Sequence, residues 1–320
     1  MGYADATTKS YTKQNHIFAD AFNFYLYGGK QMIKPEQLHE LDVEELSILP
    51  GADRKGNRKG EAVQKYRDVL KRVTAMEDGK AAYLLLGIEN QSAVHYAAPV
   101  RNLLYDALQY ARQVEATAKN HRESGDYRGR KEGEFLSGFY RDDKLIPVIT
   151  LIILFSPDEW DGPRSLRDMM DVKDPELLEW VPDYPIHLVS PWELTADEMK
   201  KFHTSLGDVL TFIKYAGSEQ KMVSWLEEEG ANVRFGHQET EVLNACVNAK
   251  IKVEEDKEAV IVCEAIDQMI RKAEKRAVER STMQSIKNLM ANLHWTAEQA
   301  ASALGLSEAE QEALLRKLPS

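Results

Sequence analysis

The sequence predicts an α/β fold, in which helices flank a mixed central sheet and an all-helical C-terminal region follows. Two short apolar runs, residues 83–88 and 145–156, have the length of strands that are buried on both faces, and the second run is rich in β-branched residues. Between them, residues 99–118 carry apolar side chains at helical spacing. A strand, a helix and a second strand in this order favour a mixed or parallel sheet with helices on both faces.

Local signals predict the remaining elements of this domain. Residues 1–13 are polar and expected to be loose. Residues 15–29 are expected to form an amphipathic helix that ends at its two glycines. A hairpin is expected around Asp78 and Gly79, with a charged arm before the turn and an apolar arm after it. Short strands are expected at 46–49 and 185–190, and base-rich loops at 51–60 and 119–135.

Three regions are predicted along the chain. The α/β domain spans residues 14–192, a helical region spans 193–281, and a small helical tail spans 282–320. Two capping boxes give the tail the punctuation of a helix-turn-helix. Its second helix is acidic, which disfavours contact with phosphates, so we expect the tail to pack against protein rather than to read DNA.

Composition limits the classes of protein that the chain can represent. Its 320 residues are 43% hydrophobic and 29% charged, as in a soluble globular protein. The net charge of −11 argues against a protein that coats nucleic acid nonspecifically. Cys246 and Cys263 are too few for a disulfide framework and lack zinc-site spacing, so reduced core thiols are expected. We see no leader sequence and no apolar run near the roughly 20 residues of a membrane helix, and therefore expect a cytoplasmic protein.

Two carboxylates and an amide lie on the arms of the predicted hairpin. Asp68 belongs to the first arm, and Glu89 directly follows the apolar run of the second arm. If the hairpin brings them together, the pair can hold a hard cation such as Mg²⁺, with the backbone carbonyl of Asn90 as a neutral third oxygen. Gln91 points to the same side of the strand as Glu89 and can orient a water molecule. Asp20, on the first helix, is a further candidate.

Each of these side chains also has an ordinary structural role open to it. Asp68 can pair with the adjacent Arg67 at the surface, which contributes little free energy. Glu89 can cap the turn after the strand, and Gln91 can bond to a loop backbone. An acid beside the apolar face of a helix, such as Asp20, is commonly solvated. Carboxylates at strand ends are common, so spacing alone leaves both interpretations open.

Positive charge is concentrated in and before the hairpin. Between positions 53 and 72 there are eight bases and three acids, and the bases include Lys65, Arg67 and Lys71. Arg101 follows on the predicted helix after the hairpin. These four bases are candidates for binding a polyanionic substrate. The alternatives are solvated loop charges and, for Arg101, simple packing of the helix on the sheet.

The ordered set of sequence strings resembles one known family. YLLLGIENQS, preceded by RDVLKRV and followed by an Arg-x-x-x-Tyr helix, resembles the recombination-promoting nuclease/transposase family of the PD-(D/E)XK nuclease superfamily. FADAFNFYLYGG resembles the family's opening helix, and PVITLIILFSPDEWDGPRSL resembles its later core strand and loop. The similarity covers most of residues 14–190 and extends more weakly into the helical tail.

The resemblance implies roles for individual residues. It points to Asp20 on the opening helix, to Asp68 as the first Asp of the motif, and to Glu89, Asn90 and Gln91 as the (D/E)-x-K element with Gln in place of Lys. It implies a PD-(D/E)XK-like sheet and a metal-dependent DNA endonuclease, linked to recombination or mobile elements, with Mg²⁺ or Mn²⁺ as cofactor. Double-strand cutting by a single-site fold usually needs two copies, so the resemblance leaves a homodimer open.

The replacement of the superfamily's Lys by Gln91 departs from the pattern. A neutral amide can only hydrogen-bond, whereas a lysine stabilises negative charge that builds up on the phosphate. Loss of such a contact can lower the rate by about 10²–10³, so a slow enzyme is expected. Arg101, Lys65 or Lys71 are candidates to supply the missing charge. The alternative is a catalytically inactive nuclease-fold module that binds DNA or protein.

Overall fold

The computed structural model of the chain describes residues 2–41, 69–77, 80–126, 131–172, 174–228, 233–253, 257–262, 281–290 and 295–304. The chain divides into two compact units. The first unit comprises Met1–Trp225 and Phe235–Ala249, and the second comprises Leu226–Arg234 and Lys250–Ser320. The first unit therefore extends past residue 192, where the sequence suggested the end of the α/β domain.

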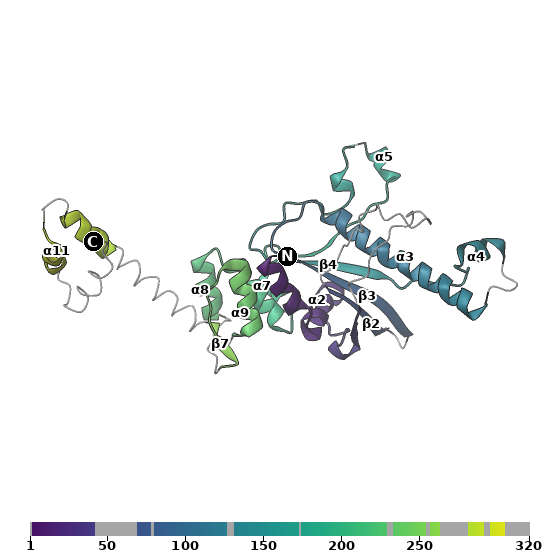
Figure 1. Ribbon diagram of the computed structural model, residues 1–320, viewed down its shortest axis with the longest axis horizontal. Coiled ribbons are helices and arrows are strands. Elements are labelled where there is room, and N and C mark those ends of the chain that lie inside the picture. The colour runs from purple at the N-terminus through teal and green to yellow at the C-terminus, as the bar shows by residue number, and fades with distance from the viewer. Residues whose placement is uncertain are drawn as a thin grey trace, which may run out of the picture. The chain divides into compact units, whose positions relative to one another are not determined.

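A mixed sheet forms the centre of the first unit, as the sequence predicts, and it has five strands (Figure 1). Its strands follow the order β1-β2-β3-β4-β5. The pairs β1–β2 and β2–β3 are antiparallel, whereas β3–β4 and β4–β5 are parallel. The strands are β1 (Leu38–Glu40), β2 (Val69–Glu77), β3 (Lys80–Gln91), β4 (Val148–Leu154) and β5 (His187–Val189).

The central hairpin is confirmed in the register that pairs Val69 with Ile88 and Glu77 with Lys80. Strand β3 is longer than the apolar run at 83–88 that predicted it. Its additional residues before the run also pair with β2. Strand β1 was not predicted. The strand expected at 46–49 and the loop expected at 51–60 lie outside the described residues.

The described helices are distributed over both units. They are α1 (Tyr3–Thr12), α2 (Asn15–Tyr27), α3 (Ala98–Ser124), α4 (Glu132–Ser137), α5 (Pro175–Glu179), α6 (Ala196–Met199), α7 (Ser205–Tyr215), α8 (Glu219–Glu228), α9 (His237–Val247) and α11 (Ala297–Ala303), with 3₁₀ turns at Pro35–Gln37 and Arg167–Met169. Strands β6 (Arg234–Gly236) and β7 (Ala259–Ile261) form a separate two-stranded sheet. Helix α2 ends as predicted, with Gly28 in the left-handed conformation at φ 62°.

Two predictions about helices are wrong. The first residues are not loose but form α1, whose Tyr11 is fully buried and bonds to Ser205 at 2.9 Å. Helix α3 continues past residue 118, so the predicted loop at 119–135 contains the last turns of α3 and the start of α4. Helix α1 is supported by the contact of Tyr11 with a distant part of the chain rather than by its own polar sequence.

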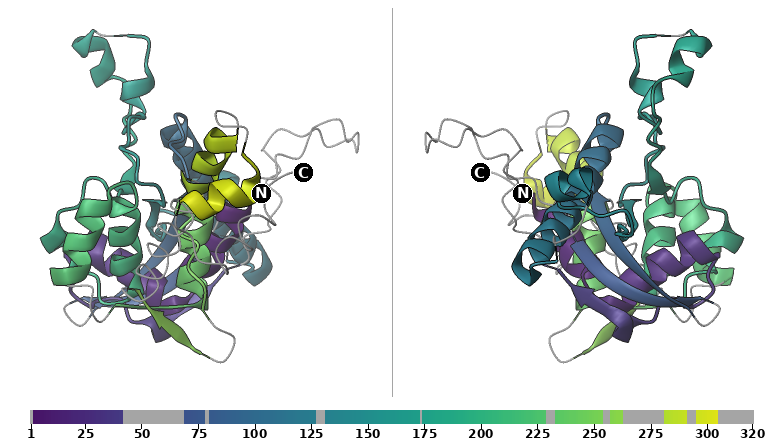
Figure 2. Two further views of the ribbon diagram at one scale, coloured as in Figure 1. Left: turned by 90° about the vertical axis from the view of Figure 1, so that its left-hand side faces the viewer. Right: turned by 90° about the vertical axis from the view of Figure 1, so that its right-hand side faces the viewer.

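The two faces of the sheet are covered by different helices. Asn90 donates to Thr12 of α1 at 2.9 Å, which marks the α1–α2 face. Thr150 donates to Asp106 of α3 at 2.5 Å, which marks the α3 face. Because side chains alternate along a strand, every second residue of β3 and β4 points to each of these helices. Figure 2 shows the sheet between these layers from two further sides.

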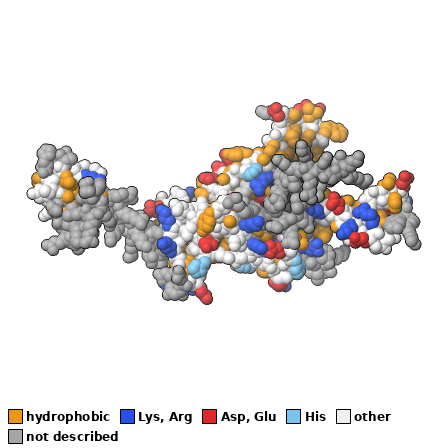
Figure 3. Space-filling model, viewed as in Figure 1, with side chains coloured by type: hydrophobic (Ala, Val, Ile, Leu, Met, Phe, Trp, Pro, Cys, Tyr) orange, Lys and Arg blue, Asp and Glu red, His pale blue; other side chains and the backbone are white. Residues whose placement is uncertain are grey.

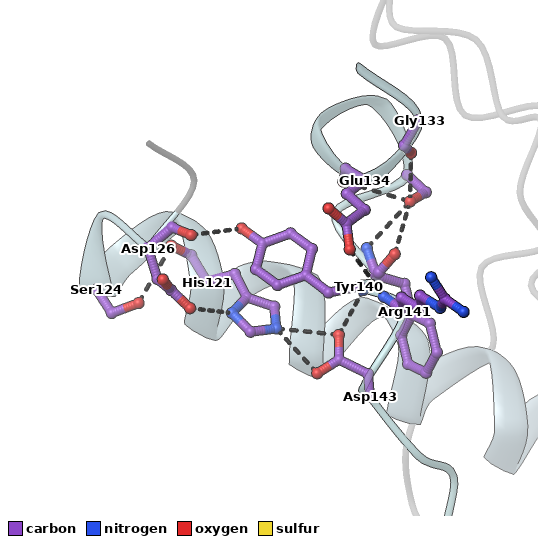
Figure 4. A network of polar contacts seen from close by, with 10 residues as sticks. His121, Ser124, Asp126, Gly133, Glu134, Tyr140, Arg141 and Asp143 are labelled. Atoms are coloured by element: carbon purple, nitrogen blue, oxygen red, sulfur yellow. Dashed lines mark hydrogen bonds and ion pairs between the residues drawn. The ribbon is translucent and has the colours of Figure 1, made fainter. Parts of the chain in front are cut away.

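The far end of α3 is fastened to the chain that leads into β4. The imidazole of His121 contacts Asp143 at 3.0 Å through Nε2 and Asp126 at 3.3 Å through Nδ1, and its ring stacks on Tyr140 at 3.8 Å (Figure 4). The backbone N–H of Tyr140 also donates to Asp143, at 2.6 Å. These contacts fix the direction in which the chain approaches β4.

Two further predictions concern membrane-spanning helices and the two cysteines. Within the described residues, no helix combines the length and the apolar character that crossing a membrane requires. Cys246 is a free thiol, as expected, but it is half-buried rather than part of the core; burial raises its pKa to about 12. Cys263 lies outside the described residues.

Candidate functional site

The carboxyl end of β3 buries three consecutive polar side chains. Glu89 is 1% exposed, and Asn90 and Gln91 are each 7% exposed. Alternation along the strand places Glu89 and Gln91 on the α3 face, while Asn90 points to α1. Burying a carboxylate costs several kcal/mol unless the charge is paired and hydrogen-bonded. The buried carboxylate of Glu89 therefore needs a partner that compensates its charge.

Arg101 pairs with the buried carboxylate from the first turn of α3. Its Nη2 donates to Oε2 of Glu89 at 2.9 Å. The side chain of Arg101 is 32% exposed, against 2% for that of Glu89. The guanidinium also lies 5.7 Å from the ring centroid of Tyr105 and 3.4 Å from its hydroxyl, one helical turn further along. Arg101 is thus partly exposed to solvent while it pairs with the buried carboxylate at the end of β3.

Gln91 adds an amide on the same face of the sheet. Within the described part of the chain its Oε1 is buried without a hydrogen-bond partner, while its backbone carbonyl accepts from the N–H of Phe155 at 2.7 Å. Leaving such an acceptor unsatisfied costs about 1–3 kcal/mol. An orphaned buried polar atom at a strand end is the kind of group that a bound water or ligand can satisfy.

Two further buried polar atoms lie at this edge of the sheet. Nε1 of Trp160 and Oγ of Ser190 are also without a hydrogen-bond partner among the described residues. Trp160 packs in an apolar cluster with Leu154, the last residue of β4, and Ser190 directly follows β5. The carboxyl ends of parallel strands are where open α/β sheets bind their ligands. The orphaned atoms therefore gather where this fold class places its sites.

Three predicted site residues lie outside the described residues. They are Lys65, Arg67 and Asp68. The first described residue of β2 is Val69, which is paired with Ile88, the neighbour of Glu89. The described chain thus reaches to within one residue of Asp68, and the distance between its carboxylate and that of Glu89 stays a prediction.

Asp20 is buried in a different setting. Its carboxylate accepts the backbone N–H of His203 at 2.9 Å and of Thr204 at 2.9 Å, and the hydroxyl of Thr204 at 2.6 Å. Thr204 is the N-cap of α7, so the negative charge of Asp20 lies where a helix N-terminus favours it. These contacts are with the start of α7, not with the end of β3. They give Asp20 a structural role, whereas its catalytic role stays a prediction.

Lys71 lies on the other face of the sheet from Glu89. Its Nζ donates to the carbonyl of Lys13 at 2.5 Å and to the side chain of Asn15, and it lies 5.0 Å from the ring centroid of Phe18. Lys71 is 1% exposed, and burial lowers its pKa. A lysine fixed to the α1–α2 junction is poorly placed to bind substrate or to replace a cation beside Gln91.

The donor set suits a hard cation in part. The described residues hold no group of three or more His, Cys, Asp or Glu side chains that could bind a metal ion. Glu89 nevertheless offers one carboxylate, and Mg²⁺ is commonly held by one or two protein carboxylates while it keeps several waters. Carboxylate and amide oxygens favour Mg²⁺ or Mn²⁺ over softer metals. The second carboxylate that the sequence suggests, Asp68, is the part that the described residues do not include.

The sequence analysis did not single out two polar residues, one on α3 and one in the loop before it. Asp106 is buried on α3 and accepts hydrogen bonds from Thr150 and from the hydroxyl of Tyr184. In the sequence, the signal for Asp106 was an acidic residue on the apolar face of a predicted helix. His95, in the loop before α3, accepts the N–H of Ala97 through Nδ1 at 3.2 Å. Burial and the charge of Arg101 lower the pKa of His95, so its imidazole is neutral at pH 7.

Comparison of the chain with protein-family models, with curated proteins and with solved structures finds no match. The structure by itself establishes a mixed α/β protein with a five-stranded sheet and a polar, buried strand end. Any narrower assignment depends on the chemistry of that strand end.

Proposed function

We propose that the chain is a metal-dependent DNA endonuclease of PD-(D/E)XK type, which hydrolyses phosphodiester bonds in recombination or in the movement of mobile elements. The observation that carries the proposal is the β2–β3 register, in which Val69 is opposite Ile88. If this register continues by one residue, Asp68 is opposite Glu89 on the α3 face. Directly opposed residues have Cβ atoms about 4.5–5.5 Å apart, which suits two carboxylates that share one cation.

In this proposal the residues at the strand ends have separate roles. Asp68 and Glu89 hold Mg²⁺ or Mn²⁺, with the carbonyl of Asn90 as a further oxygen. The bound cation neutralises charge on the phosphoryl oxygens and lowers the pKa of a bound water. Gln91 accepts a hydrogen bond from the attacking water through Oε1, the atom that is buried without a partner in the described part of the chain. Asp20 fixes the start of α7 and takes no direct part in the chemistry of this proposal.

Arg101 is the best-placed described residue to supply the positive charge that Gln91 lacks. It already lies 2.9 Å from Glu89, and a third of its side chain is exposed. A guanidinium binds phosphate oxygens in a planar, two-pronged geometry and stays charged at any physiological pH. Lys71 is excluded from this role in our proposal because it points to the opposite face. Lys65 and Arg67 remain candidates for contacts with the DNA backbone.

The test of this proposal is nicking of supercoiled plasmid by the full chain in the presence of Mg²⁺ or Mn²⁺. We expect slow, metal-dependent conversion to open circles by the wild type and none by Glu89→Gln. Calorimetric titration with Mn²⁺ gives a readout that is independent of turnover: the wild type should bind, and Asp68→Asn should bind at least tenfold more weakly. Equal metal binding by the wild type and Asp68→Asn contradicts the shared site. DNA is the expected substrate, and sedimentation shows whether the active form is a homodimer.

A second function is favoured by one observation. Arg101 already neutralises the charge of Glu89 through Oε2, and Gln91 is neutral where the PD-(D/E)XK pattern has lysine. The same fold can therefore be a catalytically inactive module that binds DNA or protein. In that case no cleavage occurs with either metal at any protein concentration, and DNA binding by Glu89→Gln equals that of the wild type.

A further inference from the structure

A stiff arm leaves the sheet between β4 and β5. We call residues 164–186 the α5 arm, since helix α5 is at its tip; Figure 2 shows it projecting from the unit that holds the sheet. Its two sides pair at the base, where Ser165 bridges Pro185 and the N–H of Ile186 donates to the carbonyl of Arg164 at 2.8 Å. These contacts make the base a short antiparallel ribbon rather than an open loop.

Side chains fasten the α5 arm further. The guanidinium of Arg167 donates twice to the carbonyl of Val181, at 3.1 Å and 2.8 Å, which joins the two sides above the base. The hydroxyl of Tyr184 donates to the buried carboxylate of Asp106 on α3. The arm is thus connected to the core by a charged hydrogen bond. A tip held in this way meets a partner with little loss of conformational entropy.

The tip exposes large apolar side chains. Trp180 is 87% exposed and Leu177 is 57% exposed, and Val172 and Met169 are also exposed. Figure 3 shows hydrophobic side chains gathered over α5. Clustered exposed apolar groups on a soluble protein mark interaction surfaces, and tryptophan is the side chain that most often dominates the binding energy of such surfaces.

The tip is also acidic. Between positions 167 and 183 there are six acids and two bases. All six acids are exposed: Asp168, Asp171, Asp174, Glu176, Glu179 and Asp183. One of the bases, Arg167, is engaged with Val181. This charge repels DNA and anionic membranes, and it disfavours pairing between the tips of two copies of the chain.

We propose that the α5 arm docks into a partner protein whose surface is an apolar socket edged by lysine and arginine. Trp180 and Leu177 enter the socket, and the surrounding carboxylates meet the basic edge. The tip projects from the sheet, so the partner supplies the concave surface. This docking function is separate from hydrolysis at the end of β3 and does not depend on it.

The test places a photo-reactive benzoylphenylalanine at position 180 of the full chain in its native cells. Position 136 serves as the matched control, because Leu136 is 75% exposed on α4, outside the arm. We expect a cross-link from position 180 that is absent from position 136. Mass spectrometry of the adduct identifies the partner and the contacted segment, which should carry lysine or arginine beside apolar residues.

Calorimetry with the purified partner then tests the chemistry. We expect Trp180→Ala to weaken binding at least tenfold, and the double variant Glu176→Lys/Glu179→Lys to weaken it and reduce its dependence on salt. Leu136→Ala should bind as the wild type does. The proposal is overturned if no cross-link is specific to position 180, or if the adduct is with a second copy of the chain. It is also overturned if the affinity changes neither in Trp180→Ala nor with salt.

Discussion

Nη2 of Arg101 donates to Oε2 of Glu89 at 2.9 Å, so a partly exposed cation holds a carboxylate that is almost completely buried. The two residues come from different elements, the start of α3 and the end of β3. Removing one member of a buried pair leaves the other charge uncompensated. Variants that keep the shape of a side chain therefore separate chemistry from folding most directly, and a truncation to alanine is compared per folded molecule.

Glu89→Gln keeps the volume of the side chain and removes its charge. If Glu89 holds the cation, we expect nicking of supercoiled plasmid to fall by at least about 10²–10³. The neutral amide can still accept a hydrogen bond from Arg101, so the circular dichroism spectrum should be unchanged. Nicking at the wild-type rate by this folded variant contradicts the proposed site.

Arg101→Ala removes the cation beside Glu89, whereas Arg101→Lys keeps the charge and loses the planar donor geometry. We expect the rate of nicking to fall about 10²-fold in the first variant and to be partly restored in the second. Single-turnover rates measured over a range of NaCl concentrations give the comparison. Identical losses in both variants indicate that the shape of Arg101 matters rather than its charge.

Asp20→Ala removes the acceptor of hydrogen bonds from the start of α7. Hydrogen bonds to a buried charged group contribute about 1.5–3 kcal/mol each. Here they share one carboxylate, so their contributions do not add in full. We expect the free energy of unfolding in urea to fall by about 3 kcal/mol. Nicking per folded molecule, at a temperature where the variant is folded, should be close to that of the wild type. Loss of nicking without loss of stability instead favours the catalytic role that the resemblance implies.

The sequence predicted the sheet because its signals there are local and strong. The apolar runs and the Asp78-Gly79 turn specify the hairpin and β4, and the structure has both at the expected places. Helix α1 was missed because its sequence is polar and its support is tertiary, through the burial of Tyr11 against α7.

The site was predicted less completely than the sheet, for a similar reason. The acceptor role of Asp20 depends on residues 183 and 184 positions away, which no spacing rule reveals. For Lys71, alternation along a strand is predictable, but which face meets which helix is not. The prediction that Glu89 and Gln91 share one side of the strand needs only period-two alternation, which is a local property of the sequence.

Trp160→Phe tests whether the indole N–H serves the fold. Nε1 of Trp160 is buried without an acceptor among the described residues, so removing it takes away an unsatisfied donor. We expect the free energy of unfolding to stay within about 1 kcal/mol of the wild-type value, because the lost packing is offset by the relieved polar group. A much larger loss of stability indicates that the N–H has a partner in solution, such as a bound water.

Lys71→Met tests the buried lysine on the α1–α2 face through the pH dependence of stability. Burial lowers the pKa of Lys71 in the folded state, while in the unfolded chain it is about 10.4. Between these two values the unfolded state binds more protons than the folded state, so the stability of the wild type rises with pH across that window. Relative to Lys71→Met, we therefore expect the wild type to gain free energy of unfolding between pH 7 and pH 10.

Urea titrations of the wild type and of Lys71→Met at these pH values measure the difference in free energy of unfolding. A difference that moves against the wild type as the pH rises contradicts the assignment. Because Lys71 faces away from Glu89, nicking by the folded variant should match that of the wild type.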